Sequence, residues 1–229
     1  IETLQSGGVV KDKTVAITVD DAYLSVYTQA WPRLKKYGFP FTIFVATDPV
    51  DNNLRNYMSW DQIRELLENG VTIGSQTKSH PHMHRLSPIK VEQELAHSNN
   101  RFLEEIGQYP QLFAYPYGEY SLDVLKAVKD AGFIAAFGQN SGVLFASDAM
   151  FELPRFAFNE NYGSIDRLKL ALDGKPLRVT DITPQDMVLS ENPPSYGFTV
   201  DQSLMPISQL RCFSGEYGKL TVEVLGPRA

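Results

Sequence analysis

Short apolar runs alternate along the chain with longer segments in which apolar residues recur every three or four positions. The short runs are rich in β-branched and aromatic residues, which is typical of strands buried in a parallel sheet, and they occupy residues 14–19, 41–45, 71–74, 112–115 and 133–137. The longer segments predict helices over residues 25–37, 60–68, 87–106, 121–129 and 164–172. Alternating strands and helices indicate an α/β fold built on a parallel sheet or barrel.

The pattern changes after residue 174. The run Asp-Gly-Lys-Pro at residues 173–176 ends the last predicted helix, and shorter alternating runs follow, of which residues 220–224 are the clearest strand. We therefore predict two domains, a β/α domain over residues 1–174 and a β-rich C-terminal extension over residues 175–229.

Composition narrows the class of protein. The chain has 229 residues, of which 43% are hydrophobic and 21% charged, as in an ordinary globular protein. A net charge of −6 and the absence of any basic run argue against a nucleic-acid partner. Cys212 is the only cysteine, so no internal disulfide can form, which leaves the cellular compartment open.

Targeting segments are not visible in the sequence. The longest apolar run, residues 39–46, is too short to cross a bilayer, so we expect no transmembrane segment. No signal peptide is recognisable, although a chain that starts at Ile1 without Met is compatible with the removal of one.

Two adjacent carboxylates, Asp20 and Asp21, end the first predicted strand. Active sites of β/α folds lie at the carboxyl edge of the parallel strands, and a buried charge needs a partner. One carboxylate could bind a metal ion while its neighbour accepts a proton. Taken alone, the same two residues are equally compatible with a helix N-cap followed by a solvated acid.

Two more strand ends carry polar motifs. Gly-Ser-Gln-Thr-Lys-Ser-His-Pro, residues 74–81, follows the third strand, and Phe-Ala-Tyr-Pro-Tyr-Gly, residues 113–118, spans the end of the fourth. Together with the Asp pair, in this order and spacing, they resemble the motifs of the polysaccharide deacetylase family, the NodB-homology or carbohydrate esterase family 4 group, over roughly residues 12–160. Residues 117–120 are most similar to the branch that deacetylates poly-N-acetylglucosamine.

The resemblance implies a fold and a chemistry. The fold is a distorted (β/α) barrel of about seven strands, and the reaction is metal-dependent hydrolysis of N-acetyl groups on an N-acetylhexosamine polysaccharide. Asp20 takes the position of the general base, while Asp21 and His80 take two of three ligand positions around a divalent ion, Zn²⁺ or else Co²⁺ or Ni²⁺. The Tyr117 backbone N–H takes the position of the oxyanion donor. Amide hydrolysis requires a nucleophile at neutral pH and a positive centre for the developing oxyanion, and a site of this kind provides both.

Other residues are expected to contact the substrate. Tyr115, Pro116 and Arg155 are expected to line the cleft, because two of them lie in the third motif and Arg155 follows a late strand-like run. Five aromatic residues are expected near the strand-end face, about two of them in contact with a ligand: Tyr23, Trp60, Tyr115, Tyr117 and Tyr120.

The sequence departs from the family pattern in three places. Gln76 stands where the first metal-binding histidine is expected, and a neutral amide oxygen is a weaker zinc ligand than imidazole. Ala114 stands at the position of the arginine that tethers the base, which predicts that the tether is missing. No histidine follows His97, so the late general acid has no counterpart, and Arg155 cannot replace it because an arginine pKa exceeds ~12.

The other histidines offer an alternative. His84 or His82 could supply the missing nitrogen, although Pro81 disfavours helical geometry at His80, and a solvated loop is the default for both. The remaining polar candidates have structural explanations: His97 on a helix surface, Asp48 in a turn before proline, and Gln139 and Asn140 either in a turn or against sugar hydroxyls.

Two functions follow from these observations. The retained carboxylates favour an active polysaccharide N-deacetylase, which the resemblance places in the periplasm or outside the cell, with a cytoplasmic location still open. Gln76, Ala114 and the absent late histidine favour a catalytically impaired relative that acts as a glycan-binding or assembly module.

Overall fold

The computed structural model describes residues 1–144, 149–203, 206–215 and 217–229. The chain divides into two compact units, Ile1–Asp173 and Gly174–Ala229. The sequence pattern predicted a division one residue later, after residue 174. Of the helices in the described part of the chain, none combines the length and the apolarity needed to cross a bilayer.

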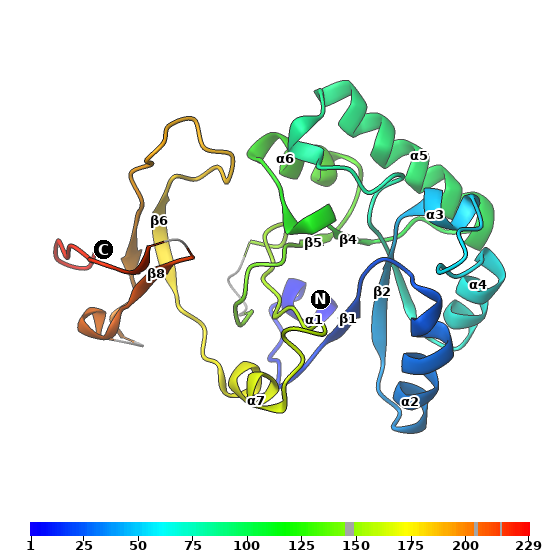
Figure 1. Cartoon of the computed structure of the whole chain (residues 1–229), viewed down its shortest axis with the longest axis horizontal. Coiled ribbons are helices and arrows are strands. Elements are labelled where there is room, and N and C mark those ends of the chain that lie inside the picture. The colour runs from blue at the N-terminus through cyan, green and yellow to red at the C-terminus, as the bar shows by residue number, and fades with distance from the viewer. Residues whose placement is uncertain (145–148, 204–205, 216) are drawn as a thin grey trace. The chain divides into compact units, whose positions relative to one another are not determined.

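A parallel sheet organises the first unit. Its strands follow chain order and each pairs in parallel with the next: β1 (Ile17–Val19), β2 (Phe41–Val45), β3 (Thr72–Ser75), β4 (Leu112–Ala114) and β5 (Ala135–Phe137). The chain then returns beside β5, where Leu153 forms a parallel bridge with Phe137. The sheet is thus a curled, partly closed barrel (Figure 1), and the predicted α/β fold is confirmed. Among the described residues this sheet has five regular strands, against about seven implied for the barrel.

Helices flank one face of this sheet (Figure 1). The main ones are α2 (Trp31–Lys36), α4 (Trp60–Glu68), α5 (Pro88–Ile106) and α6 (Leu122–Asp130), and three others complete the unit: α1 (Glu2–Gln5), α3 (Thr47–Asp51) and α7 (Ile165–Asp173). The hydroxyls of Ser59 and Ser121 cap α4 and α6 by accepting backbone N–H groups at 3.3 and 3.2 Å, as their positions in the sequence predict.

Two segments that contain a proline differ locally from the sequence prediction. The helix expected over residues 25–37 begins as a π-helical turn, Val26–Ala30, before α2, since Pro32 has no N–H to continue the α-helical ladder. Asp48 was expected in a turn, but it lies in the first turn of α3, where Pro49 is tolerated.

The strand β2 buries side chains on both of its faces. Ile43 and Val45 of β2 pack toward the helices, whereas Phe44 points into the barrel and meets Phe137 at a ring distance of 5.6 Å. At Gly74 an added Cβ would lie 2.5 Å from the Phe44 ring, so this neighbour of Phe44 must be glycine. Burial on both faces explains why the sequence of β2 is mostly apolar rather than alternating.

The second unit is small and antiparallel. It pairs β6 (Val179–Thr183) with β7 (Gly197–Val200), and β8 (Cys212–Ser214) with β9 (Gly218–Leu220). Phe198, Val200 and Leu210 form its core. The strand expected over residues 220–224 is instead β9, which ends at Leu220.

Candidate active site

The segments that follow β1, β3 and β4 meet at the carboxyl edge of the sheet. Left-handed backbone conformations gather there, although they are unfavourable for residues other than glycine. Among the described residues eight non-glycine positions have positive φ, and five of these lie in the three segments: Asp21 (74°), Ala22 (53°), Thr77 (71°), His80 (57°) and Tyr117 (59°). Backbone strain of this kind collects at functional sites, where the surrounding packing holds it in place.

Asp20 is held by a bidentate ion pair. Arg155 donates from Nη1 to one carboxylate oxygen at 2.7 Å and from Nη2 to the other at 2.9 Å. The two side chains are only 13% and 21% exposed. This planar arrangement fixes both oxygens of the carboxylate. The tether expected at the position of Ala114 is absent, and Arg155 holds Asp20 instead.

Arg155 is itself fixed from several sides. Its Nε donates to the Gly138 carbonyl at 2.9 Å, and Nη1 also donates to the Thr18 hydroxyl at 3.1 Å. The guanidinium lies over the rings of Phe44 and Phe137, 5.5 and 6.0 Å from their centres. Arg155 therefore connects the segment beside β5, which contains Leu153, to Thr18 of β1. From the sequence, Arg155 was expected only to line the cleft.

Asp21 contacts both His80 and Gln76. The Asp21 Oδ1 and His80 Nε2 atoms are 3.4 Å apart, and Gln76 Oε1 accepts the Asp21 backbone N–H at 3.2 Å. Burial raises the pKa of Asp21 and the neighbouring His80 lowers it, with a net rise. Gln76 is 1% exposed, and its Nε2 has no hydrogen-bond partner.

The Asp21 and His80 atoms fit a divalent cation. Metal–ligand bonds of about 2.0–2.2 Å at a tetrahedral angle separate two ligand atoms by about 3.4 Å, the distance found between Asp21 and His80. A cation would also relieve the burial of the Asp21 charge. Gln76 contributes a neutral amide whose oxygen already accepts one hydrogen bond, so the protein offers two strong ligands and one weak one.

Tyr117 lies in a tight turn with φ 59° and ψ 4°. The bonds of the turn use the N–H groups of Gly118 and Glu119, which donate to Tyr115 and Pro116, and so leave the Tyr117 N–H outside the turn's own ladder. Gly118 has φ 72°, and a Cβ there would lie 2.6 Å from the Gln139 backbone nitrogen. The turn therefore packs closely against Gln139, in the segment just after β5.

Burial separates the aromatic candidates. Tyr23 and Tyr117 are 41% and 48% exposed, whereas three of the five expected aromatics are buried: Trp60, Tyr115 and Tyr120. The Tyr115 hydroxyl donates to the Phe151 carbonyl at 3.0 Å, so this side chain belongs to the core rather than to a cleft. Pro116 is buried as well. Neither side chain fits the substrate contact that the sequence suggested.

One aromatic residue at the site escaped the sequence reasoning. Tyr57 forms an antiparallel bridge with Tyr23, and their rings are 4.9 Å apart. Burial, followed by the Tyr23 hydroxyl and the charge of Asp21, raises the pKa of Tyr57 to about 12. Tyr23 and Tyr57 are more than thirty residues apart, so no local sequence pattern could predict their contact.

His82 and His84 are not free loop residues. His82 Nδ1 lies 2.6 Å from Glu119 Oε2, and His84 Nδ1 lies 3.4 Å from the same oxygen. The His82 ring also stacks on Tyr117 with centres 4.1 Å apart. The solvated loop expected for these two histidines is therefore wrong.

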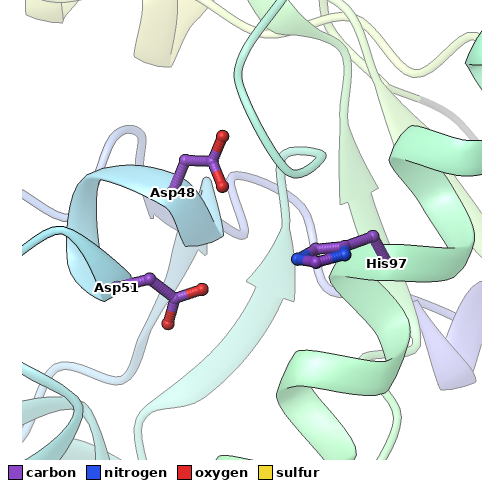
Figure 2. Close-up of side chains that lie close together, drawn as sticks. All are labelled: Asp48, Asp51 and His97. Atoms are coloured by element: carbon purple, nitrogen blue, oxygen red, sulfur yellow. The ribbon is translucent and has the colours of Figure 1, made fainter.

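A second group of possible metal ligands borders the segment that follows β3, because the Asp48 backbone N–H donates to the Lys78 carbonyl at 2.9 Å. Among the described residues, Asp48 and Asp51 of α3 and His97 of α5 place ligand atoms within 4.8 Å of one another (Figure 2). The Asp51 carboxylate, however, accepts from Arg101 at 2.8 and 3.1 Å and from Trp60 Nε1 at 2.7 Å. A guanidinium on the ligand oxygens disfavours a cation there.

Comparison with known proteins identifies the motifs. The family model for polysaccharide deacetylase matches residues 7–136. A putative polysaccharide deacetylase of Bacillus subtilis, YxkH, is 31% identical over 144 residues, covering 63% of this chain and 51% of that protein. The poly-beta-1,6-N-acetyl-D-glucosamine N-deacetylase of Staphylococcus aureus is 26% identical over 164 residues, covering 65% and 56%. The chain spans about half the length of these two relatives.

Solved structures share the fold. The Streptococcus pyogenes deacetylase PplD superposes with a TM-score of 0.70 at 24% identity, covering 75% of this chain and 76% of its own. IcaB from Ammonifex degensii superposes with a TM-score of 0.64 at 24% identity, covering 73% and 76%.

Proposed function

The chain belongs to the polysaccharide deacetylase family, and from that premise we propose that it hydrolyses N-acetyl groups of an N-acetylhexosamine polysaccharide with the aid of a divalent metal ion. The observation that supports this most directly is the pairing of two carboxylates with different partners. Asp20 is held by Arg155, and Asp21 faces His80. The two carboxylates can therefore take different roles although they are adjacent in the sequence.

Different residues of the protein take different roles in the proposed reaction. Asp20, with both oxygens oriented by Arg155, accepts the proton of the attacking water. The Tyr117 N–H donates to the acetyl oxygen as negative charge develops on it, and a donor of this kind contributes about 2.7–4 kcal/mol in the transition state. Asp21 and His80 would hold the cation, with the Gln76 amide beside them. Bound there, the ion supplies Lewis acidity to the carbonyl and lowers the pKa of water.

The exposed aromatic residues support a sugar substrate. Tyr23, Tyr57 and Tyr117 lie around the carboxylates, and the first and last of them expose 41% and 48% of their surface. The apolar faces of pyranose rings pack against such side chains. The Staphylococcus aureus relative acts on a β-1,6-linked N-acetylglucosamine polymer by its name, and we propose the same class of polymer here, which would place the activity in the periplasm or outside the cell.

Gln76 favours a second candidate function. A protein whose third ligand position is a neutral amide, and whose sequence has no histidine after His97, could bind the glycan without hydrolysing it. The two candidates share the fold and the aromatic residues, but they differ in turnover.

Acetate release separates them. Purified protein is loaded with Zn²⁺, Co²⁺ or Ni²⁺ and incubated with N-acetylglucosamine pentamers, and acetate is measured alongside the metal content. An enzyme releases acetate, loses the activity in EDTA and recovers it with metal, while Asp20→Asn keeps the metal and releases none. Pentamer binding without acetate under every metal would refute the deacetylase proposal in favour of the binding module.

A further inference from the structure

Two histidines of the loop after β3, His80 and His82, contact the Tyr117 ring. His82 stacks on one face with ring centres 4.1 Å apart and an interplanar angle of 14°. His80 meets the ring edge-on at 4.6 Å and 68°. The loop after β3 thereby holds the loop after β4 through a side chain whose own backbone is in the left-handed region.

Glu119 holds His82 in this position. Its Oε2 lies 2.6 Å from His82 Nδ1, and that hydrogen bond, the largest of several causes, lowers the pKa of Glu119. The ionised carboxylate has no proton to give, so Nδ1–H is the donor. Since Glu119 is two residues after Tyr117, the bond returns to the turn that carries Tyr117, and His82, Glu119 and Tyr117 form a closed loop of contacts.

The conformation of Tyr117 requires such support. Its φ of 59° is unfavourable for a side chain with a Cβ, and Gly118 follows with φ 72°. In a turn made of two left-handed residues, a small change in φ or ψ turns the Tyr117 peptide group and redirects its N–H. A donor in an oxyanion site must be aimed before the charge develops, because reorganisation during the reaction forfeits its effect.

We propose that Glu119 and His82 are positioning residues that clamp the Tyr117 ring and so fix the direction of the Tyr117 backbone N–H. The inference rests on the proposed function, because it concerns the donor of that same reaction. Neither residue touches the reacting atoms: each acts through Tyr117. His82 and Glu119 thus have a role in the proposed reaction although neither is a metal ligand or the general base.

Substitutions at Glu119 and His82 test the clamp through turnover. Glu119→Ala and His82→Ala should lower kcat for the pentamer by about 100-fold, the effect of losing one oxyanion donor, with KM changed by less than threefold. Glu119→Gln retains an oxygen that accepts from Nδ1–H and should recover kcat to within about fivefold of the wild type. Asp130→Ala, which breaks an exposed ion pair with Lys126 on α6, is the matched control and should leave both constants unchanged.

A second measurement does not depend on turnover. In protein labelled with ¹⁵N-tyrosine, the Tyr117 amide signal, assigned by its loss in Tyr117→Phe, should be single and sharp in the wild type and Glu119→Gln. In His82→Ala it should broaden or split, as the turn samples more than one conformation. An unchanged signal together with an unchanged kcat in His82→Ala would overturn the clamp, as would equal losses of kcat in Glu119→Gln and Glu119→Ala. A wild-type protein without acetate release would overturn the proposed function alone, because the amide signal still decides on the clamp.

Discussion

Removing Arg155 is the sharpest test of how the barrel prepares Asp20. The two charge-assisted hydrogen bonds, of 2.7 and 2.9 Å, lie between side chains that are mostly buried. Bonds to charged groups contribute about 1.5–3 kcal/mol each, and an unpaired buried charge costs about 3–5 kcal/mol. Residual solvent contact at both side chains reduces this, and we expect Arg155→Met to lower the free energy of unfolding by about 2–4 kcal/mol.

Activity should fall further than stability suggests. A displacement of about 1 Å in a catalytic group costs on the order of 100-fold in rate. Among the described residues only the guanidinium fork bonds both Asp20 oxygens, whereas Gln139 Nε2 reaches Oδ2 alone, at 3.5 Å. Arg155→Met should therefore lower kcat by about 100–1,000-fold. Arg155→Lys keeps the charge but presents a single ammonium, which cannot engage both oxygens in parallel, and should lower kcat by about 10–100-fold.

Acetate release and thermal unfolding measure these effects together. The transition of the first unit should move down by about 5–15 °C in Arg155→Met. Arg167→Met is a matched control, because Arg167 also lies over two aromatic rings, Phe158 and Tyr162, without a carboxylate partner in the site. Wild-type kcat and an unchanged unfolding temperature in Arg155→Met would refute the reasoning that the ion pair orients the base.

Three more changes probe the frame around the site. Gly118→Ala should lower the free energy of unfolding by about 2–3 kcal/mol, since its Cβ would lie 2.6 Å from the Gln139 nitrogen at a φ of 72°; an unchanged urea midpoint would contradict this. Burial alone would raise the pKa of Asp51, but hydrogen bonds led by Arg101 lower it below 3.8. Asp51→Asn should therefore lower the free energy of unfolding by about 1–3 kcal/mol at pH 7, and by progressively less as the pH falls below about 4. An equal loss at pH 3 and pH 7 in denaturant titrations would argue against the ion pair. Gln76→His should tighten Zn²⁺ binding by at least about tenfold in a chelator competition, and an unchanged affinity would place the metal elsewhere.

Local patterns carried much of the fold. The apolar strands and the serine caps of α4 and α6 depend on residues a few positions apart, so their order could be predicted from the sequence. The motifs placed Asp20, Asp21 and Tyr117 at strand ends for the same reason. Their roles in catalysis and metal binding stay predictions, although the structure brings the side chains together.

Contacts between residues distant in the sequence could not be predicted from such local patterns. Arg155 pairs with Asp20 across 135 positions, and only the curl of the sheet brings its segment beside β1. The stacking of His82 on Tyr117 and the burial of Tyr115 likewise depend on which loops meet and which face of a strand is covered.

The sequence by itself determined the order of strands and helices and the chemistry offered at the strand ends, because hydrophobic period, caps and motifs are local properties of the chain. The tertiary structure alone decided which groups complete that chemistry. Arg155 takes the place of a tether lost from the third motif, and Glu119 reaches His82. Closing a barrel brings distant side chains within hydrogen-bond distance, and no spacing along the chain encodes that proximity.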